Sequence, residues 1–215
     1  GGAHPTMIKE NALQEVAQLD AVAWNEGEYS MLEYLEKLEQ KKLNIKIAGI
    51  AYRSNEGNII KGPERVPIDD INTLPIPDRS LTPPYQYSGA IEQYKKLPMT
   101  NMFTTRGCPF NCIYCMSDLL GNKVRYRSAQ KVIEEMEYLI KDFGIQDIAF
   151  WDDIFTLNKK RLYDICRIIK QKKLPIIWSA QARADCVDPE MLDVMAEAGC
   201  WKLFYGVESL LQKNL

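Results

Sequence analysis

The chain has 215 residues, a formal net charge of −2 and 46% hydrophobic residues, which suits one full domain or two partial ones. The near-neutral charge argues against a nucleic-acid partner, which usually needs a basic face. No apolar run approaches the roughly 20 residues of a membrane span, and the first residues show no signal-peptide pattern. Six unevenly spaced cysteines are not typical of a secreted disulfide framework. We therefore expect a cytoplasmic protein with free thiols, some of them metal ligands.

Residues 1–61 alternate between helical and extended patterns. Helical spacing over residues 8–16 and an amphipathic pattern over 28–42 predict two helices, the second with an apolar stripe of Met31, Leu32, Leu35 and Leu38. A short apolar strand covers residues 20–24, and two more strands flank a turn at Gly57. We interpret residues 1–61 as the C-terminal part of an α/β domain. Because the chain begins at Gly1 and ends at "VESLLQKNL", we expect it to be an internal piece of a longer protein.

Residues 62–98 are interpreted as a linker between domains. Proline fixes φ and lacks a backbone donor, so a proline-rich stretch forms neither a regular helix nor a central strand. Seven of the eleven prolines lie here: Pro63, Pro67, Pro75, Pro77, Pro83, Pro84 and Pro98.

Residues 99–215 alternate strands with helices, at the interval of βαβ units. Strands are predicted over residues 99–105, 147–151, 174–180 and 201–207, and helices over 128–144, 158–173 and 188–199. Ser128, Asn158 and Asp188 are the predicted N-caps. The pattern predicts a parallel sheet with right-handed crossovers, either the first half of a (β/α) barrel or a piece of an open doubly wound sheet.

Chemically active residues follow each predicted strand. The first strand leads to Cys108, Cys112 and Cys115, and the second to Asp152 and Asp153. The later two strands lead to "QARAD", with Arg183, and to "GVES", with Gly206 and Glu208. Since parallel strands end at one edge of the sheet, we expect these residues to converge there.

The cysteine spacing C-x3-C-x2-C supplies three soft ligands, which suit zinc or an iron–sulfur cluster. A structural zinc site needs a fourth ligand, and the only histidine, His4, lies in the other predicted domain. Cys166 is predicted to belong to the core, while Cys186 and Cys200 stay open as further ligands. A three-cysteine cluster would leave one metal position open, as catalytic sites do. A zinc-binding interaction module and a cluster-containing electron carrier are the alternatives.

The motif "CPFNCIYC", with Tyr114 before its last cysteine, resembles the radical S-adenosylmethionine superfamily. The resemblance implies a TIM-like barrel in which Cys108, Cys112 and Cys115 ligate three irons of a 4Fe-4S cluster. S-adenosylmethionine would bind the fourth iron, and the reduced cluster would cleave it to methionine and a 5′-deoxyadenosyl radical. Tyr114 would lie against the adenine of S-adenosylmethionine. Further contacts to this cofactor are implied for Asp152, Asp153, Arg183, Gly206 and Glu208.

The segments "VRYRS", "FWDDIFTLNKKRL", "ARAD" and "YGVES" resemble the cobalamin-dependent class of that superfamily. This class includes anaerobic magnesium-protoporphyrin ester cyclases and many methyltransferases. It implies that residues 1–61 end a Rossmann-like cobalamin-binding domain, with Gly1 and Gly2 against the cobalamin, and that residues 99–215 begin the barrel. "WDD" stands where the superfamily often has Gly-Gly-Glu. Arg183 could bind the methionine carboxylate bidentately, and a structural ion pair of Arg183 with Asp185 is the alternative.

The resemblance implies methylation, cyclisation or rearrangement of an unactivated carbon in a small-molecule substrate, under anaerobic conditions. A flavodoxin or ferredoxin would be the electron donor. The alternative within the superfamily is a protein without cobalamin, such as a methylthiotransferase-like enzyme.

Overall fold

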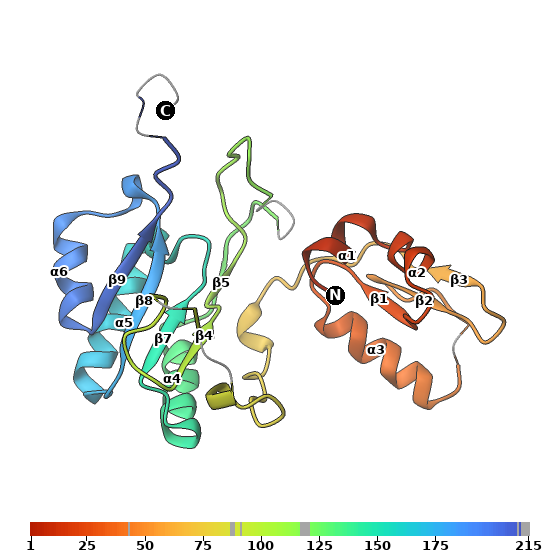
Figure 1. Ribbon diagram of the computed structural model, residues 1–215, viewed down its shortest axis with the longest axis horizontal. Helices are drawn as coiled ribbons and strands as arrows, with labels where there is room; N and C mark the ends of the chain where they lie inside the picture. Colours follow the sequence, from red (N-terminus) through yellow and green to blue (C-terminus); the bar gives the residue numbers. More distant parts are fainter. Residues whose placement is uncertain (43, 87–88, 91, 117–120, 210, 212–215) are drawn as a thin grey trace. The chain divides into compact units, whose positions relative to one another are not determined.

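The computed structural model describes the chain except for residues 43, 87–88, 91, 117–120, 210 and 212–215. It forms two compact units (Figure 1). The first unit contains Gly1–Asp69 and Pro109–Asn122, and the second contains Asp70–Cys108 and Lys123–Leu215. The domain boundaries predicted after residues 61 and 98 stay a prediction. Within the described residues, the helices are all too short or too polar to cross a membrane.

The first unit is built on a three-stranded antiparallel sheet in the order β1-β2-β3. Its elements are α1 (Ala3–Ile8), α2 (Asn11–Glu15), β1 (Ala21–Ala23), α3 (Glu28–Glu39), β2 (Ile50–Arg53) and β3 (Ile59–Lys61). The predicted hairpin between β2 and β3 is present, and Gly57 has a φ of 83° in its turn. Trp24 and Leu13 are almost completely buried on one side of this sheet.

Two predictions for this unit are corrected. The helical pattern over residues 8–16 is divided between α1 and α2, because the backbone of Lys9 turns to a φ of 48° between them. Helix α3 forms, but its apolar stripe does not face the sheet. Ser30 and Tyr34 are the buried positions, and the ring centroid of Tyr34 lies 5.5 Å from that of Tyr52. The stripe is exposed at all four positions: Met31, Leu32, Leu35 and Leu38.

The second unit contains the predicted four-stranded parallel sheet. Its strands are β4 (Met99–Met102), β7 (Asp147–Phe150), β8 (Ile177–Ala182) and β9 (Cys200–Tyr205), adjacent in that order. Each neighbouring pair is parallel. The strand order equals the chain order, as a barrel wound in one direction requires. The predicted α/β class and parallel sheet are therefore confirmed.

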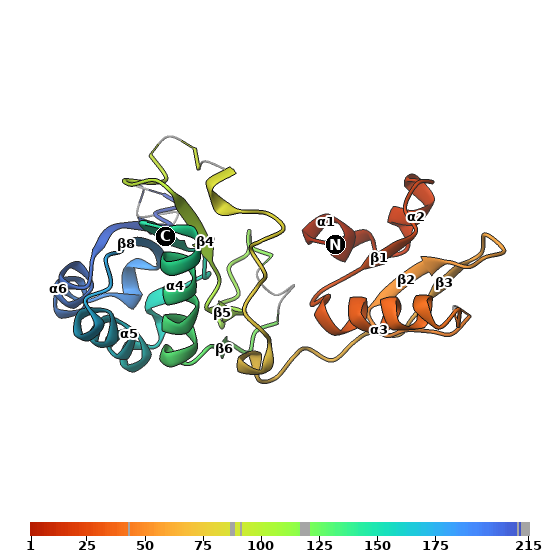
Figure 2. The same cartoon turned by 90° about the horizontal axis from the view of Figure 1, so that it is seen from below.

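Helices α4 (Ala129–Phe143), α5 (Lys159–Lys172) and α6 (Pro189–Glu197) lie side by side along one face of this sheet (Figure 2). Each begins at its predicted cap. The Ser128 hydroxyl accepts from the Lys131 N–H, and the side chains of Asn158 and Asp188 do the same for the first turns of α5 and α6. Between helices and sheet, Phe150 stacks on Phe155 with ring centroids 4.6 Å apart, and both rings contact Trp178. Burying aromatic rings of this size stabilises the unit by about 2–3 kcal/mol each.

The proline-rich segment contains only two short 3-10 helices within its described residues, at Ile71–Thr73 and Pro84–Gln86. The strand predicted over residues 99–105 is interrupted. Strand β4 ends at Met102, and a second strand, β5 (Thr105–Arg106), pairs antiparallel with β6 (Arg125–Tyr126). The break follows from hydrogen bonding: the Thr104 N–H and hydroxyl donate to Asp152, so residue 104 leaves the parallel ladder.

Candidate functional site

The cysteine motif lies on the connection of a β-hairpin. Thr105 pairs with Tyr126 and Arg106 with Arg125, and the chain between these strands carries Cys108, Cys112 and Cys115. We call residues 105–126 the cysteine hairpin. Its second strand was not predicted, although the alternation of "VRYRS" is a strand signal.

The three motif cysteines differ in exposure. Cys108 is buried, Cys112 is half-buried and Cys115 is exposed. The Cys115 N–H donates to the Cys112 carbonyl at 3.0 Å, which forms a single turn. Among the described residues, histidine, cysteine, aspartate and glutamate side chains form no group of three or more that could hold a metal ion. Tyr114, the predicted adenine contact, is 64% exposed.

The carboxyl ends of the parallel strands bring the other predicted site residues to one edge of the sheet. Strand β7 runs into Asp152 and Asp153, β8 into Arg183, and β9 into Gly206. The Trp151 N–H donates to the Met102 carbonyl at 2.9 Å, which continues the pairing of β7 with β4 up to that edge. The expected convergence of strand ends is therefore present in the topology.

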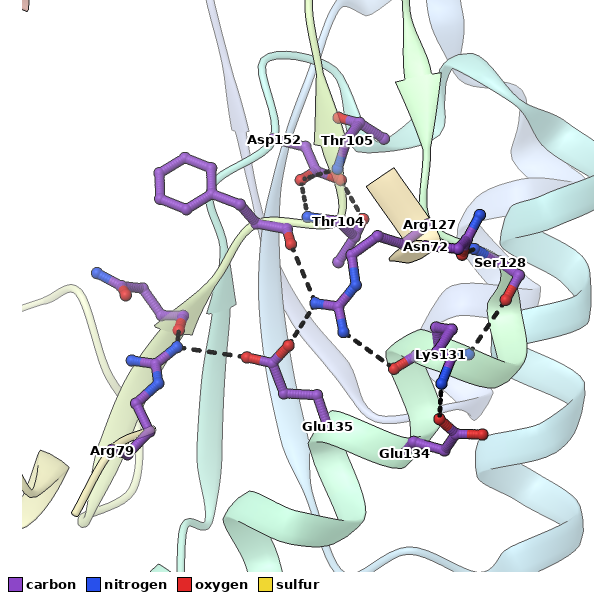
Figure 3. Close-up of polar contacts among 12 residues, drawn as sticks. Asn72, Arg79, Thr104, Thr105, Arg127, Ser128, Lys131, Glu134, Glu135 and Asp152 are labelled. Atoms are coloured by element: carbon purple, nitrogen blue, oxygen red, sulfur yellow. Dashed lines mark hydrogen bonds and ion pairs between the residues drawn. The ribbon is translucent and has the colours of Figure 1, made fainter. Parts of the chain in front are cut away.

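The two aspartates after β7 have different surroundings. Asp152 is 1% exposed, and its carboxylate accepts from the Thr104 N–H, the Thr104 hydroxyl and, at 2.9 Å, the Thr105 N–H (Figure 3). Burial raises the pKa of Asp152, while the hydrogen bonds from Thr104 and the charge of Arg161 lower it in part. Asp153 is exposed, although partial desolvation raises its pKa as well. Only Asp153 therefore presents its carboxylate at the surface.

Arg183 and Asp185 form the ion pair that was expected as the alternative to a cofactor contact. The Arg183 Nε lies 2.9 Å from Asp185 Oδ1, and its Nη2 lies 2.8 Å from Oδ2. This bidentate geometry holds the pKa of Asp185 below its usual value. The pair is at the surface, so its two charges remain within reach of a ligand.

The segment after β9 and the N-terminal glycines have unusual backbone conformations. A Cβ atom on Gly206 would lie 2.6 Å from Glu208 Oε1, and Glu208 itself has a φ of 58°. Gly2 has a φ of 112°, and its carbonyl accepts from the Thr6 N–H at 3.1 Å and the Thr6 hydroxyl at 2.8 Å. Gly1 and Gly2 are both exposed. Cofactor contacts by these residues stay predictions.

A buried charged network beside the cysteine hairpin was not predicted. The Glu135 carboxylate on α4, 1% exposed, accepts from Arg79 and Arg127 (Figure 3). Arg127 also donates to the Phe103 and Lys131 carbonyls, and Arg161 donates to two backbone carbonyls nearby. A signal was available, because Glu135 lies on the same helical face as the apolar residues Val132, Met136 and Leu139. Such a charge on an apolar face indicates a buried pair.

Similarity to known proteins assigns the chain to a family. The family model described as the Radical SAM superfamily matches residues 102–214, just over half of the chain. An uncharacterized methyltransferase of Pyrococcus horikoshii is 37% identical over 97% of this chain, which covers 44% of that protein. The anaerobic magnesium-protoporphyrin IX monomethyl ester cyclase of Rubrivivax gelatinosus is 27% identical over 100% of this chain, which covers 39% of it.

Two solved structures share the fold. The cobalamin-dependent S-adenosylmethionine radical enzyme OxsB with aqua-cobalamin bound has a TM-score of 0.71 at 23% identity, covering 100% of this chain and 31% of that one. The radical S-adenosylmethionine methyltransferase TsrM from Kitasatospora setae has a TM-score of 0.68 at 19% identity, covering 94% of this chain and 40% of that one.

The chain belongs to the radical S-adenosylmethionine superfamily, as its cysteine motif predicted. It spans less than half the length of the two relatives named above.

Proposed function

We propose that the protein is a cobalamin-dependent radical S-adenosylmethionine enzyme that methylates, cyclises or rearranges an unactivated carbon of a small molecule. The observation that carries the proposal is the cysteine motif on a hairpin that directly follows the first strand of a parallel α/β sheet. Support also comes from the relatives, whose names describe methyltransferases and a cyclase. Support for cobalamin comes from OxsB and TsrM, which share the fold of this chain and hold cobalamin in their solved structures.

The donor set fits a 4Fe-4S cluster. Iron–sulfur clusters are held by cysteine thiolates, and Cys108, Cys112 and Cys115 lie within eight consecutive residues. Together they would leave one iron for S-adenosylmethionine. When bound and reduced, the cluster supplies the electron that cleaves S-adenosylmethionine to a carbon radical. An electron donor such as flavodoxin or ferredoxin, and a reducing, cytoplasmic setting, belong to the same proposal.

The chain's own residues would hold S-adenosylmethionine at the carboxyl edge of the sheet. The exposed carboxylate of Asp153 can accept from its ammonium group, and Glu208 offers a second acceptor to that group or to the ribose hydroxyls. Arg183 can bind the methionine carboxylate through its planar donor pair, in exchange for Asp185. Tyr114 would pack on the adenine, and Gly1 and Gly2 would let the backbone approach cobalamin.

The experiment that tests the proposal is anaerobic reconstitution with iron and sulfide, followed by reduction and electron paramagnetic resonance with and without S-adenosylmethionine. We expect a 4Fe-4S signal that changes when S-adenosylmethionine is added and that is lost in Cys115→Ala. A cluster indifferent to S-adenosylmethionine would favour an electron carrier. Bound zinc that reconstitution does not replace would favour an interaction module. Cobalamin absorbance retained through gel filtration would separate the cobalamin-dependent class from a methylthiotransferase-like protein.

A further inference from the structure

Thr104 is the junction between the parallel sheet and the cysteine hairpin. It is fully buried and lies between the last residue of β4, Met102, and the first residue of β5, Thr105. Every polar group of Thr104 is used. Its N–H and hydroxyl donate to the Asp152 carboxylate, and its carbonyl accepts from the Arg127 N–H at 2.9 Å and from Arg161 Nη2 at 3.2 Å. The junction is therefore held from two sides.

Asp152 holds the entry of the hairpin. It comes from the end of a different strand, β7, and its carboxylate accepts from the N–H groups of two consecutive residues, Thr104 and Thr105. A carboxylate offers about four lone-pair positions, and three of them are taken here. Since these donors belong to the chain and Asp152 is buried, its carboxylate is not presented to a ligand.

Arg161 joins the entry of the hairpin to its exit. Its side chain, on α5, is 7% exposed, and its Nε donates to the Arg127 carbonyl at 2.7 Å, just after β6. Its Nη2 donates to the Thr104 carbonyl, just before β5. The guanidinium carbon also lies 5.6 Å from the centroid of the Tyr126 ring. One planar group thus bridges the two chain segments between which all three motif cysteines lie.

We infer that Asp152 and Arg161 are positioning residues that hold the base of the cysteine hairpin, and that of the two aspartates only Asp153 is left to contact S-adenosylmethionine. The inference rests on the proposed function only where it assigns a metal cluster to the hairpin. The hydrogen bonds that hold the base of the hairpin are a property of this chain alone. The physical reason is that three thiols on one loop can converge on a cluster only if the two ends of the loop are fixed. Cys108 lies two positions after Arg106, the last residue of β5. A displacement of the backbone at Thr104 would therefore also displace Cys108, the first predicted ligand.

The test uses two pairs of matched variants. Asp152→Asn keeps the size of the side chain but removes the negative charge of the group that accepts three hydrogen bonds. Asp153→Asn makes the same change one residue later. Arg161→Lys removes the planar group that reaches two carbonyls, since an ammonium is a point donor. Ile165→Val, in the buried core of α5, lowers global stability without touching the hairpin.

Two measurements separate the inference from the proposed function. The first is hydrogen exchange of the Thr104, Thr105 and Arg127 amides in the iron-free protein, which needs no cluster. The second is the rate at which an iron chelator removes the reconstituted cluster, with the electron paramagnetic resonance signal recorded with and without S-adenosylmethionine. We expect Asp152→Asn and Arg161→Lys to increase exchange at these amides and to speed iron loss by about tenfold, the size usual for residues that support metal ligands. Ile165→Val should change neither the exchange of these amides, relative to the rest of the unit, nor the rate of iron loss.

Asp153→Asn should load and keep the cluster normally but show a weaker response to S-adenosylmethionine. The inference is overturned if Asp152→Asn keeps the hairpin amides protected and the cluster stable, or if Asp153→Asn loses iron as fast as Asp152→Asn. If the wild-type protein takes up no cluster, the proposed function fails. The exchange data still decide whether Asp152 and Arg161 hold the base of the hairpin. If Asp152→Asn does not fold, Thr104→Val, which removes a single donor to Asp152, decides the same question by exchange at Thr105.

Discussion

The carboxylate of Glu135, buried on α4, is paired with the guanidinium of Arg127 at the exit of the cysteine hairpin. The same carboxylate accepts from Arg79 Nη2 at 3.4 Å, and Arg79 in turn donates to the Asn101 carbonyl of β4 at 2.9 Å. One acidic side chain therefore pairs with two arginines, one at β4 and one at the exit of the cysteine hairpin. Pairing with opposite charge is the condition under which a carboxylate can be buried.

Removing this carboxylate should be strongly destabilising. In Glu135→Gln two guanidinium groups lose the anion that they share while they stay largely buried. We expect the free energy of unfolding to fall by about 3–5 kcal/mol, the usual cost of leaving a buried charge unpaired. Urea denaturation measures this loss. The neighbouring Glu134→Gln, which removes an exposed ion pair with Lys131, is the control and should leave the midpoint nearly unchanged. Equal losses in both variants would contradict the buried-pair account.

Two glycines with positive φ should respond differently to alanine. Gly144 ends α4 with a φ of 65°, and nothing lies within 4 Å of a Cβ placed there. Gly199 has a φ of 91°, and its Cβ would lie 2.7 Å from the Ile176 carbonyl oxygen. We expect Gly144→Ala to cost about 1–2 kcal/mol from backbone strain alone. Gly199→Ala should cost about 1–3 kcal/mol more, because strands β8 and β9 must separate locally. Thermal unfolding of the two variants compares them, and a smaller loss for Gly199→Ala would show that the strands yield freely.

The first unit should lose stability in acid through Glu64. Its carboxylate accepts from Lys9 and from the Trp24 indole N–H, the latter at 2.9 Å. The hydrogen bond from Lys9, followed by that from Trp24, lowers the pKa of Glu64 below its ordinary value of 4.5. A lowered pKa means that the stabilisation is present above pH 4.5 and is lost as the pH falls through the lowered value. The indole N–H resonance of Trp24 should shift in this range, and the shift should be absent in Glu64→Gln. A resonance that first moves well above pH 4.5 would contradict the assignment.

The cysteines should differ in their rates of alkylation. Burial raises the pKa of Cys166 and of Cys200 to about 12, so both thiols are protonated near pH 8. Cys115 is exposed. In the iron-free protein, iodoacetamide at pH 8 should modify Cys115 at least tenfold faster than Cys166. Mass spectrometry of the digested protein gives the order of modification, and the same reaction in urea should remove the difference. Rapid labelling of Cys166 in the folded protein would show that α5 opens from the core.

Local patterns in the sequence were sufficient for the three helices and the four parallel strands of the second unit, although not for the antiparallel pair of β5 and β6. The caps at Ser128, Asn158 and Asp188 depend on side chains that reach only three residues along the chain, so local sequence determines them. The alternation of strands and helices also determined the parallel sheet, because βαβ connections have one favoured hand. The cysteine motif determined the family in the same way, since its chemistry depends on spacing within a single loop.

The tertiary structure decided what the sequence left open. The exposed stripe of α3 shows that an apolar pattern does not reveal which face of a helix is buried, since Ser30 and Tyr34 are the buried positions of α3. The role of Asp152 depended on Thr104, 48 residues earlier, and that of Arg161 depended on both ends of the hairpin. A carboxylate beside a predicted site has the same sequence whether it faces a ligand or the protein's own N–H groups. Only the fold, which brings distant donors within hydrogen-bonding distance, distinguishes these cases, because a hydrogen bond depends on position in space and not on separation along the chain.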